Sequence, residues 1–97
     1  MTFEFAPTTS SLPEVLDLNA AAPLAARLLA LRGGAVTLDA SQVTRFGGLC
    51  LQVMLAARAA WRADGNAFQV SGRSQAFDEA LALFGAAGFD AAPEARP

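Results

Sequence analysis

The sequence predicts a single α/β domain with a mostly parallel four-stranded sheet and helices packed on it, in the order β-β-α-β-α-β-α. Three observations lead to this prediction. Short apolar segments with the two-residue alternation or β-branched composition of strands recur along the chain. Segments with the apolar spacing of amphipathic helices lie between them, and glycines or turn signals separate the two kinds. Strands that alternate with helices imply parallel strands joined by crossovers.

The first half of the chain supplies two strands and one helix. Residues 2–6 alternate apolar and polar side chains and predict a strand, and the polar residues 8–11 predict a turn. Residues 12–18 predict a second strand, which Pro13 places at a sheet edge because proline donates no hydrogen bond. Residues 20–32 predict a helix that ends at two glycines.

The second half alternates strands and helices. It predicts, in order, a strand at residues 35–39, an extended piece at 43–46, a helix over 49–63, a strand at 67–70 and a final helix capped by Ser74 and ended by Gly85. We expect one domain over residues 1–90, followed by a frayed tail over residues 91–97.

The composition excludes most enzyme designs. The 97 residues are 54% hydrophobic and 16% charged, which excludes a globally disordered chain. There is no histidine, so histidine-based acid–base catalysis, serine–histidine triads and histidine-ligated metals are excluded. The acidic residues show no paired-carboxylate or metal-ligand spacing. We therefore expect a protein that is not an enzyme, with no catalytic residue, no cofactor and no bound metal.

Charge and hydropathy limit which partners and which cellular compartment we expect. All seven cationic residues are arginines scattered along the chain, so a surface for nucleic acid is not expected. The sequence shows no signal peptide and no apolar run long enough to span a membrane, so we expect no direct membrane insertion. The one cysteine excludes a disulfide within the chain and favours a cytoplasmic location.

A motif in the middle of the chain resembles the STAS family, which includes anti-sigma factor antagonists and the cytoplasmic tails of sulfate transporters. The family strand reads roughly hydrophobic-D-L-S-x-V-x-x-hydrophobic, and D-[ST]-[SA]-G-L follows at a helix start. The first half is present as Leu38, Asp39, Ser41, Val43 and Phe46. The order of elements also agrees, from about residue 12 to residue 89.

The second half of the motif departs from the family pattern. Gly47 stands at the aspartate, Gly48 at the serine or threonine, Leu49 at the usual phosphoacceptor serine and Cys50 at the glycine, whereas Leu51 matches. The resemblance therefore implies the family scaffold without a phosphorylation site at position 49.

The resemblance also implies where partners bind, because STAS domains meet their partners at the start of this helix. The predicted partner-binding residues lie around that start and are Arg45, Gly47, Gly48, Leu49, Cys50, Gln52 and Val53.

Each prominent feature has a second interpretation. The two glycines form either an anion cradle or, as we favour, a tight turn that needs a flexible backbone. Leu49 is either a docking side chain or part of the core. Cys50 is either a reactive thiol or, as we favour, a buried small hydrophobe. Arg45 either contacts a partner or is solvated, and Asp39 is expected to close a turn.

Taken together, the sequence predicts a non-enzymatic protein-binding regulator in bacterial signalling. The resemblance implies a histidine kinase or an anti-sigma factor with a kinase-like ATP-binding domain as partner. Residues 48–53 are also similar to a bacterial STAS subgroup associated with chemotaxis gene clusters. The alternative is a STAS subunit bound to the ATPase of an Mla-type lipid-transport ABC complex. Residues 43–46 are similar to a strand of the STAS subunit in that system.

Overall fold

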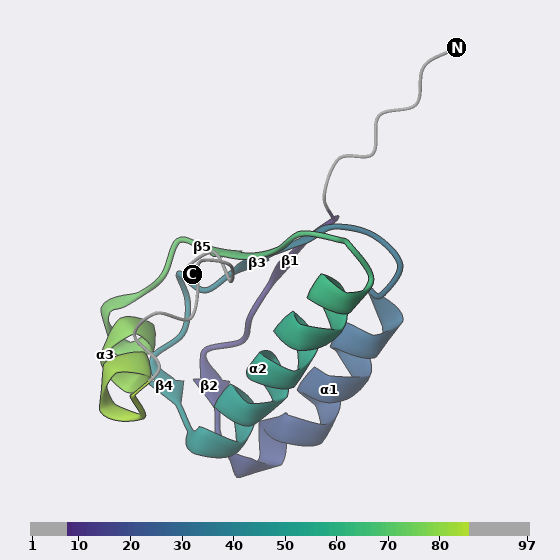
Figure 1. Cartoon of the computed structure of the whole chain (residues 1–97). Helices are drawn as coiled ribbons and strands as arrows, with labels where there is room; N and C mark the ends of the chain where they lie inside the picture. The colour runs from purple at the N-terminus through teal and green to yellow at the C-terminus, as the bar shows by residue number, and fades with distance from the viewer. Residues whose placement is uncertain (1–7, 86–97) are drawn as a thin grey trace.

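The computed structural model describes residues 8–85 (Figure 1). The strand predicted at residues 2–6 and the tail predicted at 91–97 lie outside the described residues. The described elements are β1 (Thr8–Ser11), β2 (Val15–Leu16), the 3-10 turn η1 (Leu18–Ala20), α1 (Ala21–Ala30), β3 (Val36–Asp39), β4 (Arg45–Phe46), α2 (Gly48–Ala63), β5 (Phe68–Ser71) and α3 (Gln75–Leu83).

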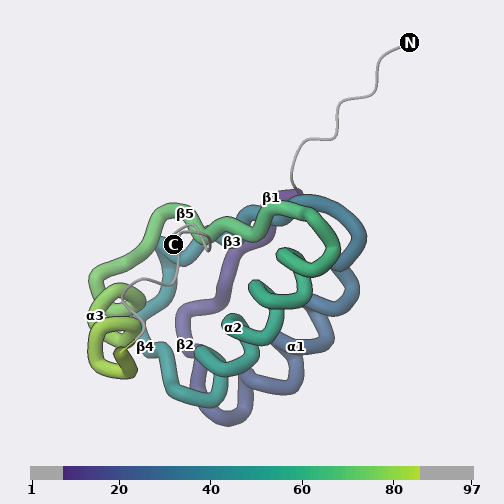
Figure 2. Tube along the Cα trace, in the orientation of Figure 1, coloured from purple at the N-terminus to yellow at the C-terminus, as the bar shows by residue number. Residues whose placement is uncertain are grey.

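The strands form two separate parallel groups. One sheet has three strands in the order β1-β3-β5, and β2 pairs with β4 in a second sheet. Helices α1 and α2 lie side by side along the three-stranded sheet, and α3 lies beyond them beside β4 (Figures 1 and 2). The predicted α/β class, with mostly parallel strands and packed helices, is thus confirmed.

The prediction of one four-stranded sheet was wrong, because the chain leaves the first sheet after Leu12. The Leu12 N–H still donates to the carbonyl of Asp39 at 2.9 Å. The next residue is Pro13, which has no N–H to continue the pairing. Only Val15 and Leu16 of the predicted strand over residues 12–18 are extended in a sheet, and they pair with β4 instead of β3.

The turn predicted at residues 8–11 was also wrong, because these residues form β1. Their backbone pairs in register with β3, from Thr8 opposite Val36 to Ser11 opposite Asp39. Three of the four side chains are exposed, which an edge strand permits and a buried strand does not. Polar composition therefore concealed a strand whose pairing is made by its backbone.

The core lies between the three-stranded sheet and helices α1 and α2, and it continues beneath α3. Trp61 near the end of α2 is 1% exposed, and its indole N–H donates to the carbonyl of Gly34 at 2.8 Å. Its ring meets Phe68 of β5 edge to face, with ring centroids 5.4 Å apart. A second aromatic pair joins β4 to α3, where Phe46 stacks on Phe77 with centroids 4.6 Å apart.

The helix boundaries follow local chemistry. The α1 helix ends at Ala30, before the predicted residue 32, and Gly33 behind it has a φ of +113°. The predicted cap of α3 is confirmed: the Ser74 hydroxyl accepts from the N–H of Phe77 at 3.0 Å and donates to the carbonyl of Val43 at 2.6 Å.

Gly72 occupies a crowded turn after β5. Its φ is +61°, a conformation that side-chain-bearing residues rarely adopt. A Cβ at this position would lie 2.9 Å from the Asp39 carboxylate oxygen and 3.3 Å from the Ser41 Cβ. The same Asp39 oxygen accepts from the Ser41 N–H at 2.9 Å, so the loops after β3 and β5 are fitted together.

We predict that Gly72→Ala lowers the free energy of unfolding by more than about 1–2 kcal/mol, the cost of the left-handed backbone alone. The added Cβ also displaces the Asp39 carboxylate. Gly65→Ala is the matched control, because Gly65 has a φ of +76° and nothing lies within 4 Å of its added Cβ. Urea unfolding of both variants tests this, and equal losses of stability would contradict it.

Candidate partner-binding surface at the start of α2

The start of α2 is fixed by the pairing of β2 with β4. Leu16 lies opposite Phe46 in this pair, and its carbonyl accepts from the N–H of Gly47 at 2.9 Å. Gly47 is the N-cap of α2, with an extended backbone (φ −94°, ψ 167°), and its carbonyl accepts from the Leu51 N–H at 3.1 Å. Backbone hydrogen bonds on both sides of Gly47 thus set where the helix begins.

The glycines at this start do not serve a strained turn. Among the described residues, glycines with positive φ lie elsewhere, at Gly33, Gly65, Gly72 and Gly85. The turn from strand to helix is tight as expected, since Gly47 alone separates β4 from α2, but neither Gly47 nor Gly48 adopts a positive φ. A Cβ on Gly48 would lie 3.5 Å from the Phe84 ring, so the bare backbone lets this ring lie close to the helix. The anion cradle stays a prediction.

Leu49 lies on the surface, with 46% of its area exposed. The interpretation as a core residue was therefore wrong. Gln52 and Arg45 are also exposed, and Val53 is half-buried. We call the group of predicted residues that reach the surface here the α2-start surface; it consists of Arg45, Gly47, Gly48, Leu49, Gln52 and Val53.

Cys50 is the predicted site residue that does not reach this surface. Its side chain is 0% exposed, and its Sγ lies 3.3 Å from the carbonyl oxygen of Asp17, to which the thiol donates. Burial raises the pKa of the thiol, and the nearby Asp17 charge raises it further. A buried thiol with a raised pKa is a packing residue, so the interpretation of Cys50 as a reactive thiol was wrong.

Phe84 is a surface residue that the sequence did not assign to this site. Phe77 and Leu81 on the same helix are fully buried. Phe84 is instead the C-cap of α3 and is 47% exposed, with its ring against Gly48. The sequence signal for this position is the glycine that follows Phe84. It indicates that Phe84 lies at the end of the helix rather than within it.

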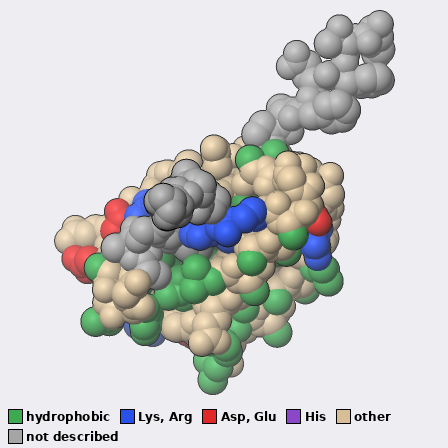
Figure 3. All heavy atoms as spheres, viewed as in Figure 1, with side chains coloured by type: hydrophobic (Ala, Val, Ile, Leu, Met, Phe, Trp, Pro, Cys, Tyr) green, Lys and Arg blue, Asp and Glu red, His purple; other side chains and the backbone are tan. Residues whose placement is uncertain are grey.

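Apolar side chains gather around this region. Hydrophobic side chains are grouped over α3, β4 and the start of α2 in the space-filling view (Figure 3). Two further apolar residues are exposed. Val15 lies opposite Arg45 in the β2–β4 pair, and Leu18 follows just after β2. Exposed apolar clusters of this kind mark binding sites on soluble domains.

Asp39 in the motif and Asp64 at the far end of α2 accept hydrogen bonds within the fold. Asp39 closes its turn as predicted, and the hydrogen bond from the Ser41 N–H lowers the pKa of its carboxyl. Asp64 accepts two hydrogen bonds from Arg32, at 2.8 and 3.1 Å, and this contact lowers the pKa of Asp64. Within residues 8–85 no group of three or more His, Cys, Asp or Glu side chains is placed to hold a metal ion.

The α2-start surface combines apolar and polar side chains. It offers two apolar side chains, one amide and one guanidinium, and the Cys50 thiol lies buried beneath it. In the described part of the chain no helix has the length and hydropathy to cross a membrane.

Comparison with known proteins identifies the family of the chain. No curated protein and no solved structure matches the chain. A family model described as "Mlab, STAS domain" matches residues 2–91, which is nearly the whole sequence. This match confirms the resemblance carried by Leu38, Asp39, Ser41 and Val43, and it agrees with the α/β fold. The chain therefore belongs to the STAS domain family, a family of regulatory and binding domains.

Proposed function

We propose that this chain is a non-enzymatic, cytoplasmic STAS regulator that docks on a protein partner through the α2-start surface and has no phosphorylation switch there. The exposure of Leu49 carries the proposal. This leucine stands where the family has its phosphoacceptor serine, and 46% of its area faces solvent. A leucine has no hydroxyl to accept phosphate, but an exposed leucine adds apolar area to an interface.

The surroundings of Leu49 support an interface that is formed before the partner arrives. The Gly47 N–H is bonded to the Leu16 carbonyl, and Cys50 anchors the first turn of α2 from below. The Phe84 ring lies against Gly48 and adds apolar area at the same place. A preorganised surface binds more tightly because little ordering is left to occur on binding.

The partner in this proposal is a histidine kinase or an anti-sigma factor, in a signalling system such as chemotaxis. Resemblance to anti-sigma factor antagonists supports this class. Arg45 offers a charged contact beside the apolar side chains, because it is exposed and immediately precedes Phe46 and the helix start. Apolar anchors with a charged group at the edge are typical of protein interfaces.

A second candidate is a structural subunit of an Mla-type lipid-transport ABC complex. The description of the matching family model, "Mlab, STAS domain", favours this candidate. In that case the α2-start surface docks on the ATPase subunit of the transporter. The absence of a hydroxyl at position 49 suits this role as well, since a structural subunit needs no phosphate switch.

We predict that Leu49→Asp weakens the partner complex by about 2 kcal/mol, roughly 30-fold in Kd, because it places a charge among apolar contacts. Leu55→Asp is the matched control, since Leu55 lies on the same helix and is 37% exposed but is not part of the α2-start surface. Titration calorimetry with the partner that co-purifies from the native host measures both. Equal weakening by the two variants, or none by Leu49→Asp, would count against the proposal.

The absence of a switch gives a second prediction. The chain isolated from its native host should carry no phosphate by intact-mass analysis, whether or not the partner kinase is active. Ser41 is the nearest serine to the lost site; it is exposed, and its N–H is bonded to Asp39. Stoichiometric, kinase-dependent phosphate on Ser41 would overturn the claim of an unswitched regulator.

The two partner classes make different predictions for co-expression. As a signalling regulator, the chain should bind the kinase or anti-sigma factor encoded near it, and should not bind a transporter ATPase. As a transporter subunit, it should form a complex with the ATPase that persists through gel filtration. If Leu49→Asp disrupts neither complex, the docking surface is wrong for both classes.

A further inference from the structure

We propose a second contact surface, which extends beyond the function proposed above: one side of α2 binds the chain's own C-terminal segment, residues 86–97. This segment follows the end of α3 and lies outside the described residues. In the proposed contact, Phe89 packs against Leu55 and Glu94 pairs with Arg62. Three features support it: the exposed apolar area on this side of α2, its charge, and the place where the segment leaves α3.

Apolar area is open along this side of α2. Residues seven apart in a helix lie two turns apart on the same side, so Gly48, Leu55 and Arg62 form one line along α2. The Phe84 ring lies against Gly48 at the start of this line. Phe84 is 47% exposed and Leu55 is 37% exposed, so the line presents apolar surface to solvent. We call these four residues the α2 flank.

The charge of the α2 flank is positive. The α2 helix contains no aspartate or glutamate, and Arg62 is exposed in its last turn. Within residues 8–85, Arg62 makes no ion pair. Arginine side chains lie beside hydrophobic ones on the face shown in Figure 3. The C-terminal segment carries two acids, Asp90 and Glu94, against one arginine, so its charge is complementary to that of Arg62.

The place of attachment brings the C-terminal segment to the α2 flank. Phe84 touches Gly48, and Phe89 is five residues further along the chain, about 17 Å at full extension. Leu55 is only about 10 Å from Gly48 along the helix axis, so Phe89 reaches it easily. A short tether gives a high effective concentration, so a modest contact is sufficient. The family model extends to residue 91, which includes Phe89 in the domain.

The charged contact follows from the same geometry. Glu94 is five residues beyond Phe89, and Arg62 is two turns of α2 beyond Leu55. An extended chain covers this distance, so the apolar and the charged contact can form together. The chain then frays after Glu94 rather than after residue 90.

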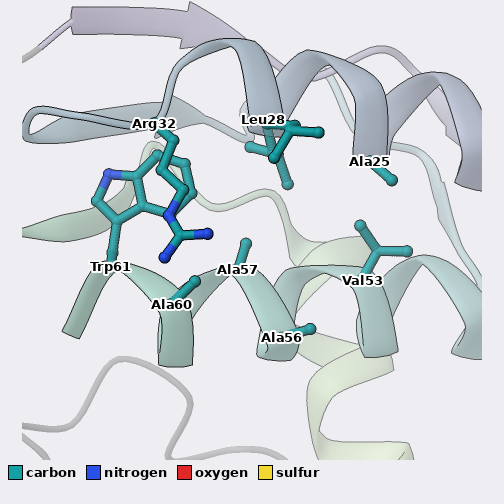
Figure 4. A pocket seen from close by; sticks show the side chains of 9 residues that line it. Ala25, Leu28, Arg32, Val53, Ala56, Ala57, Ala60 and Trp61 are labelled. Carbon is teal, nitrogen blue, oxygen red and sulfur yellow. The ribbon is translucent and has the colours of Figure 1, made fainter. Parts of the chain in front are cut away.

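The groove between α1 and α2 is a second apolar surface on α2, and it fits the segment less well. Its volume is about 250 Å³, and Ala25, Val53 and Trp61 are among the side chains that line it (Figure 4). Among its described lining residues the charged one is Arg32, which is paired with Asp64. The groove therefore offers no open positive charge to the acids of the segment.

Paramagnetic broadening of backbone amide signals tests the docked position in the full chain. A nitroxide attached to Ala92→Cys lies between the two proposed contacts, and the native Cys50 is buried and does not take the label. We expect the signals of Leu55 and Arg62 to broaden strongly and the signals of α1 to broaden much less. Equal broadening of both helices would overturn the proposal, and stronger broadening of α1 would assign the segment to the groove instead.

Two pairs of variants identify the apolar contact. Phe89→Ala removes the anchor and should abolish the selective broadening, whereas Arg96→Ala should leave it unchanged. Leu55→Asp should abolish it as well, whereas Leu29→Asp on α1, also at an exposed leucine, should not. Circular dichroism shows whether the variants remain folded, and Phe89→Ala keeps the test decisive if Leu55→Asp does not fold.

A charge exchange tests the second contact. Arg62→Glu should reduce the selective broadening, and adding Glu94→Arg to the same chain should restore it. Selective broadening that survives Phe89→Ala, or that Arg62→Glu leaves unchanged, would overturn the proposed contact. Leu49→Asp should leave the broadening unchanged, because Leu49 lies on a different side of α2 from Leu55. Failure of this contact and failure of the α2-start surface are therefore separable.

Discussion

The stack of Phe46 on Phe77 determines how the third helix lies against the start of the second. The two rings are nearly parallel, 8° apart, and both side chains are buried. Phe46 is the last residue of β4 and immediately precedes Gly47, whereas Phe77 lies in the first turn of α3. The Ser74 hydroxyl strengthens the same junction through the Val43 carbonyl. Since α3 is held here, its far end brings the Phe84 ring to Gly48, and an aromatic ring lies beside the α2-start surface.

The first turn of α2 divides sharply between core and surface. Cys50 and Leu51 are buried, while Leu49 beside them is exposed. The resemblance implies that Gly47 replaces an aspartate at the N-cap, and glycine at this position costs a helix only a few tenths of a kcal/mol relative to a good cap. The scaffold thus keeps its helix start without the acidic, hydroxyl-bearing motif. In the proposed function, the absence of that motif removes a chemical switch and leaves the docking geometry in place.

The sequence predicted the helices and the strands β3 and β5 well because their side chains carry the signal. Buried positions of β3 and α2 are apolar at the right spacing, and Ser74 has the chemistry of a cap. The edge strand β1 could not be predicted in this way, since its pairing is made by the backbone and its side chains are exposed and polar. The division into two sheets depends on which strand β2 pairs with after Pro13. That pairing is set by tertiary contacts, which a local sequence pattern does not reveal.

Six of the seven predicted site residues reach the surface, whereas Cys50 is buried. Spacing along a helix cannot tell which of Leu49 and Cys50 faces inward, because that depends on the direction from which the core approaches. Phe84 is 36 residues from Gly48 in the chain, so no local pattern joins them. The groove between α1 and α2 was not visible in the sequence either, since alanines at helical spacing are typical of any well-packed helix pair.

The central claim is that the partner docks at the start of α2, and nuclear magnetic resonance tests it most directly. Isotope-labelled chain is titrated with its co-purified partner, and the backbone amide signals are followed. We expect the largest changes at Gly48, Leu49 and Gln52, with smaller changes at Arg45 and Phe84. Unchanged signals at these residues, with changes confined to other surfaces, would contradict it.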